Sequence, residues 1–287
     1  MKKSMLWFLA FVITLAAAYY QRKTGPTYPK AVNVTVNDSV YELKLVRSLG
    51  LDERPEVKLG IADTSIRARL FYKRFRTNDE YSESEFRYKV YPVNSPLMNR
   101  VFKVTEERGF FAEIPQQPPA GKLQYYLELT DSQGTTTLNK ENPVVIRFKS
   151  VVPSLILTPH ILFMFLAMLL STFAGLLALI KHPHFRKYSL WTLIILIIGG
   201  MILGPLVQKY AFGAFWTGWP FGHDLTDNKT LVAFLAWLVA YLRLRKDNAN
   251  RAWVIAAAII LLMVYLIPHS MFGSELDYNT GDIKTGK

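Results

Sequence analysis

The chain has 287 residues, of which 51% are hydrophobic, and its mean hydropathy of +0.14 is too apolar for an ordinary soluble protein and too polar for a pure membrane bundle. The net charge is +12, but residues 21–152 mix both signs and contain no basic block, which argues against a nucleic-acid partner. There is no cysteine, which excludes disulfides, thiolate metal sites, covalent c-type haem attachment and cysteine nucleophiles.

Five apolar runs predict membrane-spanning helices, because about 20 apolar residues are needed to cross a bilayer. They are Met5 to Tyr20, Ile161 to Ile180, Leu190 to Val207, Leu231 to Leu242 and Trp253 to Ile267. The last two are short, so their helices are expected to extend into the flanking polar residues. The first run also fits a cleaved signal peptide, since Ala16 and Ala18 satisfy the small-residue cleavage rule. We favour an uncleaved anchor over residues 1–24, because Tyr and Gln-Arg-Lys follow the run as interfacial anchors would.

Between the first two runs, from Ala31 to Ser150, apolar and polar residues alternate with a period of two. The alternation recurs in segments such as VNVTV, VYELKLV, IRARLFYKRF and LQYYLELT, and turn sequences rich in Gly, Pro, Asp and Ser separate these segments. About eight strands in about 120 residues suit a small antiparallel sandwich. The sequence therefore predicts an all-β sandwich over residues 25–152.

The late strands of this region carry a resemblance to known domains. The run from Ile114 to Asp131, IPQQPPAGKLQYYLELTD, followed by a strand from Val144 to Phe148, resembles immunoglobulin-like or fibronectin type III-like sandwiches. The resemblance covers about a third of the domain and implies a module that mediates contacts, although a fold alone does not define a function. Residues 21–152 contain no histidine, which excludes an imidazole-based copper or zinc site there.

The cations outside this domain predict the membrane topology. Most of them fall at the N-terminus and in two alternate loops: Lys2, Lys3, Lys181, Arg186, Lys187, Arg243, Arg245, Lys246 and Arg251. Acidic residues dominate the other side: Asp224, Asp227, Glu275, Asp277 and Asp282. By the positive-inside rule the N-terminus is cytoplasmic, and residues 21–152, 208–229 and 268–287 are external or periplasmic. The predicted location is the inner (plasma) membrane, with the lipid bilayer as the first partner.

Three of the five histidines, His160, His223 and His269, then fall at the outer interface. His160 lies in the first turn of the second span, on the stripe of small residues that marks helix packing in membranes. His223 and Asp224 precede the fourth span, and His269 follows the last one. We identify His160 and His269 as candidate haem or other cofactor ligands. The candidate metal ligands are His160, His223, Asp224 and His269.

The stretch FWTGWPFGHDLTDNK, residues 215–229, is open to three interpretations. It is an aromatic belt whose neighbouring histidines bond to carboxylates or backbone. Alternatively, the histidines bind haem or, with Asp224, a zinc, iron or copper ion. In the third interpretation a histidine beside Asp224 acts as a general base. No nucleophile elbow, Walker loop, zinc-protease or dinucleotide motif supports catalysis, and we assign no catalytic residue.

The sequence therefore predicts a multi-domain membrane protein. An N-terminal transmembrane anchor is followed by an all-β ectodomain and by a four-helix transmembrane domain over residues 153–287, with an outer loop at 208–229 and an external C-terminal tail. The predicted function is that of a non-enzymatic envelope subunit that docks or assembles another envelope or membrane protein through the sandwich. The alternative is a haem- or metal-binding membrane protein for electron transfer or cofactor assembly.

Overall fold

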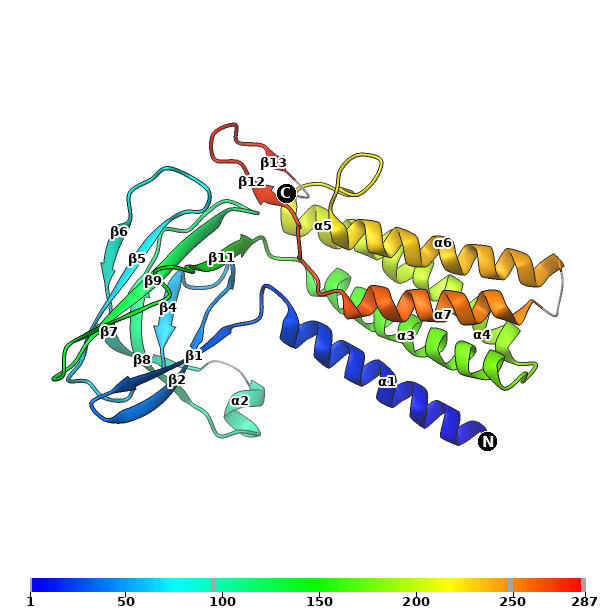
Figure 1. The fold of residues 1–287 in the computed structure, drawn as a ribbon, viewed down its shortest axis with the longest axis horizontal. Coiled ribbons are helices and arrows are strands. Elements are labelled where there is room, and N and C mark those ends of the chain that lie inside the picture. The colour runs from blue at the N-terminus through cyan, green and yellow to red at the C-terminus, as the bar shows by residue number, and fades with distance from the viewer. Residues whose placement is uncertain (1, 94–95, 247–249, 285–287) are drawn as a thin grey trace. The chain divides into compact units, whose positions relative to one another are not determined.

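The computed structural model describes residues 2–93, 96–246 and 250–284, which form two compact units (Figure 1). The helical unit comprises Met1–Pro26, Ser150–Glu275 and Ile283–Lys287. The β unit comprises Thr27–Lys149 and Leu276–Asp282. The short C-terminal segment Leu276–Asp282, which the sequence placed with the membrane half, is thus grouped with the β unit.

Two sheets and a hairpin build the β unit, so the predicted region rich in β-sheet is confirmed. The larger sheet has the order β3-β11-β9-β5-β6, and β10 also pairs with β9. Its strands are β3 Ser48–Gly50, β11 Val144–Lys149, β9 Lys122–Thr130, β5 Arg67–Arg74, β6 Ser82–Glu85 and β10 Thr135–Leu138. The smaller sheet has the order β4-β8-β7, with bounds Glu56–Leu59, Glu106–Glu113 and Arg87–Pro92. The hairpin pairs β1, Lys30–Val36, with β2, Ser39–Leu45. Within these sheets and the hairpin, the described pairs are antiparallel except β3 with β11, which is parallel.

Strand β9 shows why the alternating sequence folds in this way. Leu123, Tyr125, Leu127 and Leu129 are buried on one face of the strand and join residues of both sheets in one core. Burying each such side chain contributes about 1.5–3 kcal/mol. The Tyr125 hydroxyl donates to the carbonyl of Val46 at 2.8 Å, so its polar end is satisfied inside the core.

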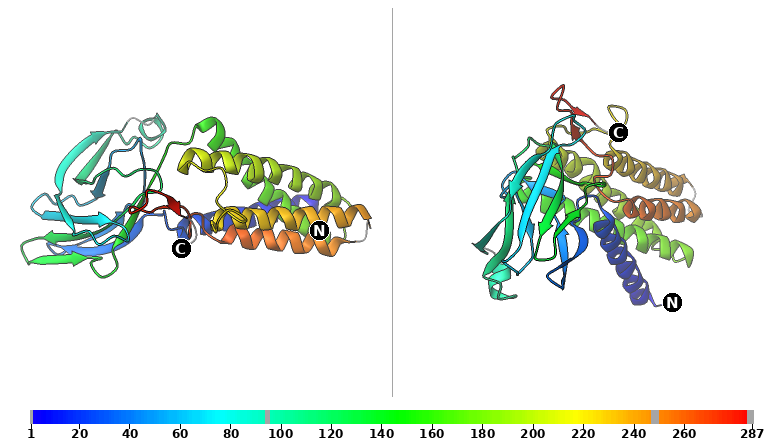
Figure 2. Two further views of the ribbon diagram at one scale, coloured as in Figure 1. Left: turned by 90° about the horizontal axis from the view of Figure 1, so that it is seen from above. Right: turned by 60° about the vertical axis from the view of Figure 1, so that its left-hand side comes forward.

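The helical unit contains five helical segments that run alongside one another (Figures 1 and 2). They are α1 Lys3–Thr24, α3 Ser154–Leu179, the continuous run α4 Phe185–Leu196, η1 Ile197–Leu203 and α5 Gly204–Phe212, then α6 Leu225–Lys246 and α7 Arg251–Leu266. Within the described chain, three are long and apolar enough to cross a membrane: Lys3–Thr24, Ser154–Leu179 and Phe185–Phe212. The shorter α7 is apolar after Arg251, its first residue. Crossings by α6 and α7 stay predictions.

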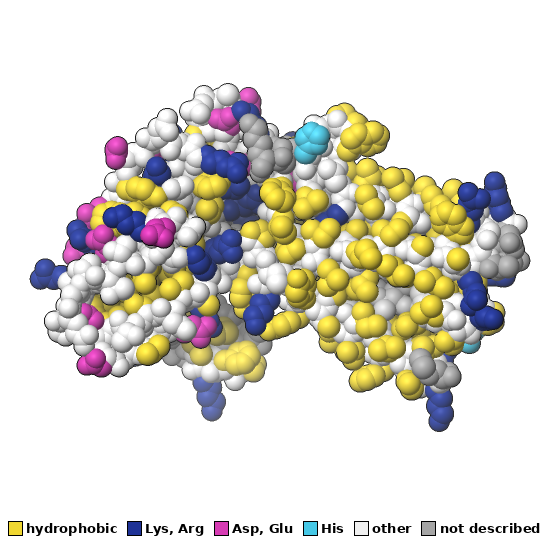
Figure 3. Space-filling model, viewed as in Figure 1, with side chains coloured by type: hydrophobic (Ala, Val, Ile, Leu, Met, Phe, Trp, Pro, Cys, Tyr) yellow, Lys and Arg dark blue, Asp and Glu magenta, His cyan; other side chains and the backbone are white. Residues whose placement is uncertain are grey.

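Close packing of small and aromatic side chains joins these helices around α3. A Cβ added at Gly175 of α3 would lie 2.7 Å from Cβ of Ala258 in α7, so the two helices approach at a position that only glycine allows. Trp7 of α1 stacks on Phe173 of α3 with ring centroids 3.8 Å apart. Hydrophobic side chains cover most of the outward face of the helices in Figure 3, as lipid contact requires.

The cations that predicted the topology gather at one end of the helical unit. Lys3 Nζ lies 3.4 Å from Nδ1 of His184, which places the start of α1 beside the turn between α3 and α4. Arg251, at the start of α7, donates to the carbonyl of Ala178 near the end of α3 at 3.3 Å. Figure 3 shows Lys and Arg side chains at this end of the helices. We call it the basic end.

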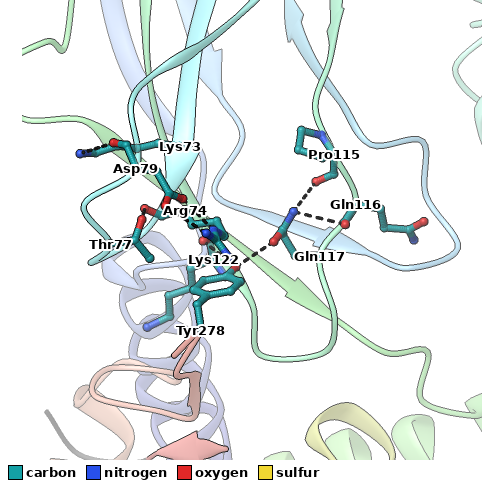
Figure 4. A network of polar contacts seen from close by, with 9 residues as sticks. All are labelled: Lys73, Arg74, Thr77, Asp79, Pro115, Gln116, Gln117, Lys122 and Tyr278. Carbon is teal, nitrogen blue, oxygen red and sulfur yellow. Dashed lines mark hydrogen bonds and ion pairs between the residues drawn. The ribbon is translucent and has the colours of Figure 1, made fainter. Parts of the chain in front are cut away.

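The C-terminal segment Leu276–Asp282, which we call the strap, is attached to the β unit through Tyr278 (Figure 4). The Tyr278 hydroxyl accepts the backbone N–H of Lys122 at 2.9 Å, and it lies 2.9 Å from the carbonyl oxygen of Lys122 and 3.0 Å from Oε1 of Gln117. The guanidinium of Arg74 lies 5.2 Å from the centre of the Tyr278 ring. The neighbouring Asp79 is hydrogen-bonded by Arg74, which lowers the pKa of Asp79 to about 2. The remaining short strands are β12, Glu275–Leu276, and β13, Ile283–Lys284.

Candidate functional site

The end of the helical unit opposite the basic end contains a cluster of buried charged side chains, which we call the polar joint. Asp224, Asp227 and Lys229, at the start of α6, are only 3%, 8% and 5% exposed. Charged groups are almost never buried unless they are paired, because their desolvation is costly. The hydrogen-bond partners of these three residues therefore show which helix ends and which loop the polar joint connects.

Lys229 ties α6 to the end of α7. Its ammonium donates to the carbonyl of Ile267 at 2.6 Å and contacts Nδ1 of His269 at 3.1 Å. Ile267 is the C-cap residue of α7, and a cation there satisfies a helix-end carbonyl and complements the negative end of the helix dipole. Gln21 at the end of α1 donates to the same carbonyl at 3.3 Å. Three helix ends thus meet at one backbone oxygen.

The two aspartates hold the loop between α5 and α6. Asp224 Oδ1 accepts the backbone N–H groups of Thr226 at 2.8 Å and Asp227 at 3.4 Å, so Asp224 caps the N-terminus of α6. Asp227 Oδ2 accepts the N–H of Thr217 at 2.7 Å and its hydroxyl at 3.1 Å. Asn228 Oδ1 accepts the N–H of Trp219 at 2.6 Å. These contacts fold residues 217–219 back onto the first turn of α6.

His160, in α3, bonds to an irregular part of the next helix. Its Nδ1 lies 2.9 Å from the carbonyl oxygen of Gly199, within the π-helical segment η1. A carbonyl only accepts, so Nδ1 of His160 carries the proton and Nε2 keeps its lone pair. Single-turn π segments inside α-helices occur frequently at functional sites. A backbone carbonyl on Nδ1 is also how ligating histidines are usually oriented.

His269 has the opposite tautomer. The Lys229 ammonium has three donors and no lone pair, so Nδ1 of His269 must accept and Nε2 must carry the proton. His269 therefore offers a donor where His160 offers an acceptor. Of these two histidines, His160 presents Nε2 with a lone pair that could ligate iron or another metal, whereas His269 would first have to break its contact with Lys229.

The structure does not gather the four predicted metal ligands into one coordination group. Among the described residues, no cluster of three or more histidine, cysteine, aspartate or glutamate side chains could hold a metal ion. The physical reasons are specific: Asp224 caps a helix, Nδ1 of His269 is engaged by Lys229, and His223 is exposed on the loop. Nε2 of His160 keeps the lone pair that a ligand needs.

Sequence reasoning missed Lys229 as a member of the polar joint and Thr217 as the partner of Asp227. Lys229 stands two residues before the apolar run at Leu231, where a cation ordinarily marks the water-facing edge of a span. Helical spacing gave no signal, because Lys229 lies five residues after Asp224 and two after Asp227, and neither separation places two side chains together on one face of a helix.

The aromatic residues of the same loop divide into two groups. Trp216 is half-buried and donates its indole N–H to the carbonyl of Trp219 at 3.0 Å. Phe215, Trp219 and Phe221 are exposed by 54%, 67% and 82%. The loop thus has one side that is polar and buried and another side that is aromatic and exposed.

Comparison with protein-family models, curated proteins and solved structures found no match to this chain.

Proposed function

We propose that the protein is an integral membrane subunit that docks a partner protein through an external β-sandwich. The basic end of the helical unit lies in the cytoplasm, since cytoplasmic loops carry the excess of Lys and Arg. The polar joint and the β unit then lie outside. The late strands β9 and β11 pair antiparallel, which supports a sandwich of the immunoglobulin-like or fibronectin type III-like kind.

The observation that carries this proposal is an exposed apolar surface on the β unit. Eight large hydrophobic side chains are exposed among its described residues, and six of them lie between residues 88 and 104. We call these six the hairpin surface: Tyr88, Val90, Met98, Val101, Phe102 and Val104. Exposed apolar side chains scattered singly are normal, whereas a concentration of them indicates an interaction site.

One hairpin carries all six residues of the hairpin surface. Strands β7 and β8 pair from Arg87 with Phe111 to Pro92 with Glu106. Beyond them the N–H of Val93 donates to Thr105 at 2.8 Å and the N–H of Val104 donates to Met98 at 3.0 Å, which closes the tip. The tip includes the short helix α2, Pro96–Arg100.

Strand β7 lies at the edge of its sheet, which favours a protein partner. In the order β4-β8-β7 it pairs with β8 alone among the described strands, so its other edge presents backbone donors and acceptors. An open edge beside apolar side chains accepts an added strand or an apolar segment of another chain. Docking of this kind needs no cofactor or catalytic group.

Site-specific photo-crosslinking in intact membranes tests the proposal. A photo-reactive residue replaces Val90 or Phe102 on the hairpin surface, and Thr136, exposed on β10, serves as the matched control. We expect the same protein adduct from positions 90 and 102, and its loss when Val101→Asp is added. Adducts formed equally from position 136, or only with lipid from positions 90 and 102, would show that this surface does not dock a protein.

A further inference from the structure

The loop between α5 and α6 exposes three large aromatic side chains that its own fold leaves uncovered. Phe215, Trp219 and Phe221 are exposed by 54%, 67% and 82%, and they fall within seven residues of one another. Large aromatic side chains are ordinarily removed from water, since each carries 150–250 Å² of surface. Three of them exposed close together indicate a surface that contacts lipid or another molecule.

The exposure is built into the loop and does not follow from a loose chain. The N–H of Trp219 donates to Asn228, the N–H of Thr217 donates to buried Asp227, and the N–H of Asp224 donates back to Thr217 at 3.0 Å. A Cβ added at Gly218 would lie 2.7 Å from Cβ of Asp227, so the backbone approaches α6 as closely as glycine permits. The polar side of the loop is fixed to the joint, and the aromatic side is thereby held outward.

Polar groups border the aromatic side in the manner of a membrane interface. Lys209 Nζ donates to the carbonyl of Gly213 at 2.7 Å and lies 5.4 Å from the centre of the Phe215 ring. Among the described residues, the indole N–H of Trp219 has no hydrogen-bond partner, so it is available to a headgroup oxygen. Trp219 combines an apolar ring with a polar N–H, and such a ring together with apolar neighbours and a nearby cation is typical of membrane–water interfaces.

Chain length places this loop at the bilayer edge. The apolar helix Phe185–Phe212 ends three residues before Phe215, and α6 starts four residues after Phe221. A chain reaches at most about 3.6 Å per residue, so Phe215 lies within about 11 Å of the end of the apolar helix, and Phe221 lies within about 15 Å of the start of α6, the predicted fourth span. A lipid interface is therefore within reach of all three rings.

We propose that residues 213–222 form a fixed aromatic anchor, in which Phe215, Trp219 and Phe221 insert into the lipid interface at the end of the helices opposite the basic end. The occupant is lipid at the boundary between headgroups and acyl chains. The inference is independent of the docking role of the β unit, because different residues carry it.

The absence of cysteine makes the anchor directly testable in the full-length protein. Single variants Phe221→Cys and Trp219→Cys are labelled with an environment-sensitive fluorophore and reconstituted into phosphatidylcholine–phosphatidylglycerol vesicles. Leu166→Cys, exposed in the middle of α3, is the deep reference, and Asn142→Cys, exposed on the β unit, is the water reference. Emission is then measured with nitroxide lipids that quench near the headgroup or near the chain end, and with aqueous iodide.

We expect the labels at positions 219 and 221 to lose more emission to the shallow nitroxide than to the deep one, with the reverse at position 166 and neither loss at position 142. Quenching by iodide alone, as at position 142, would overturn the anchor, because the rings would lie in water. Protection from all three quenchers would also overturn it and would assign the surface to a protein. The substituted side chains make none of the bonds that hold the loop, so the variants keep its fold, and agreement between positions 219 and 221 checks this.

Discussion

The hydroxyl of Tyr278 attaches the strap to the β unit, and Tyr278→Phe removes that hydroxyl while retaining the ring (Figure 4). The hydroxyl has one proton, so it accepts the N–H of Lys122 and donates either to the carbonyl of Lys122 or to Gln117. Two neutral hydrogen bonds are lost, at about 1 kcal/mol each. The expected cost is about 2 kcal/mol, which is about a thirtyfold rise in the equilibrium constant for strap opening.

Hydrogen exchange followed by mass spectrometry of the full-length protein in detergent measures this constant for residues 276–282. We expect about thirtyfold faster exchange in Tyr278→Phe, with the helical unit unchanged. Tyr41→Phe is the matched control, because the Tyr41 hydroxyl makes no hydrogen bond among the described residues of the β unit. Identical strap exchange in Tyr278→Phe and the unmodified protein would refute the attachment.

Three further substitutions probe the two units. Lys229→Met leaves a helix-end carbonyl and an imidazole without their charged donor, and thermal unfolding in detergent should report a loss of about 1–3 kcal/mol. Gly175→Val forces side-chain atoms against Ala258 and should cost about 1–3 kcal/mol in the same assay. Asp79→Asn acts through pH: hydrogen bonding from Arg74 lowers the pKa of Asp79 from 3.8 to about 2, so its stabilisation is present above pH 4 and is lost as the pH falls to 2. Denaturant titrations across that range should show a shallower decline in Asp79→Asn.

Matched controls separate these effects from general damage. Lys187→Met removes an exposed cation from the helical unit and should leave unfolding unchanged. Gly60→Ala adds a Cβ where nothing lies within 4 Å. Glu80→Gln removes an exposed carboxylate next to Asp79 and should keep the acid-range slope. Equal losses in a variant and its control would contradict the corresponding contact.

Local pattern predicted the β-rich region, because the central strands have one face in a core, whereas β6, β7 and β10 bury no residue. In β9 the alternation of LQYYLELT matches the burial of Leu123, Tyr125, Leu127 and Leu129, and Tyr126 on the opposite face is the one departure, because it is buried as well. The same reasoning found long apolar helices, since a bilayer demands uninterrupted apolar length. The strand signal is a period of two in hydrophobicity, and the helix signal is the number of consecutive apolar residues. Both can be detected within a short window of sequence.

Contacts between distant segments lie outside such windows. The strap sequence LDYNTGD has no alternation, and its position depends on Tyr278 meeting Lys122, 156 residues earlier. The bond of His160 to Gly199 depends on a π-helical turn, which the apolar run IIGGMIL does not signal. The sequence predicted that His160 and His269 both fall at the outer membrane interface. Only the hydrogen-bond geometry assigns the two imidazole rings different tautomers.

Because the two tautomers differ, the hypothesis of a bound haem or metal ion now predicts that His160, and not His269, is the ligand. A haem iron or metal ion bound by the protein would use Nε2 of His160, whose Nδ1 proton is fixed by Gly199, and would bypass His269, whose lone pair is engaged by Lys229. Absorption spectra and elemental analysis of gently purified protein should then show bound cofactor lost in His160→Ala and retained in His269→Ala. Loss in both variants would mean that His269 leaves Lys229 to ligate, and a protein with no Soret band and no stoichiometric metal would refute the hypothesis, leaving His160 as a packing contact to the π-helical turn.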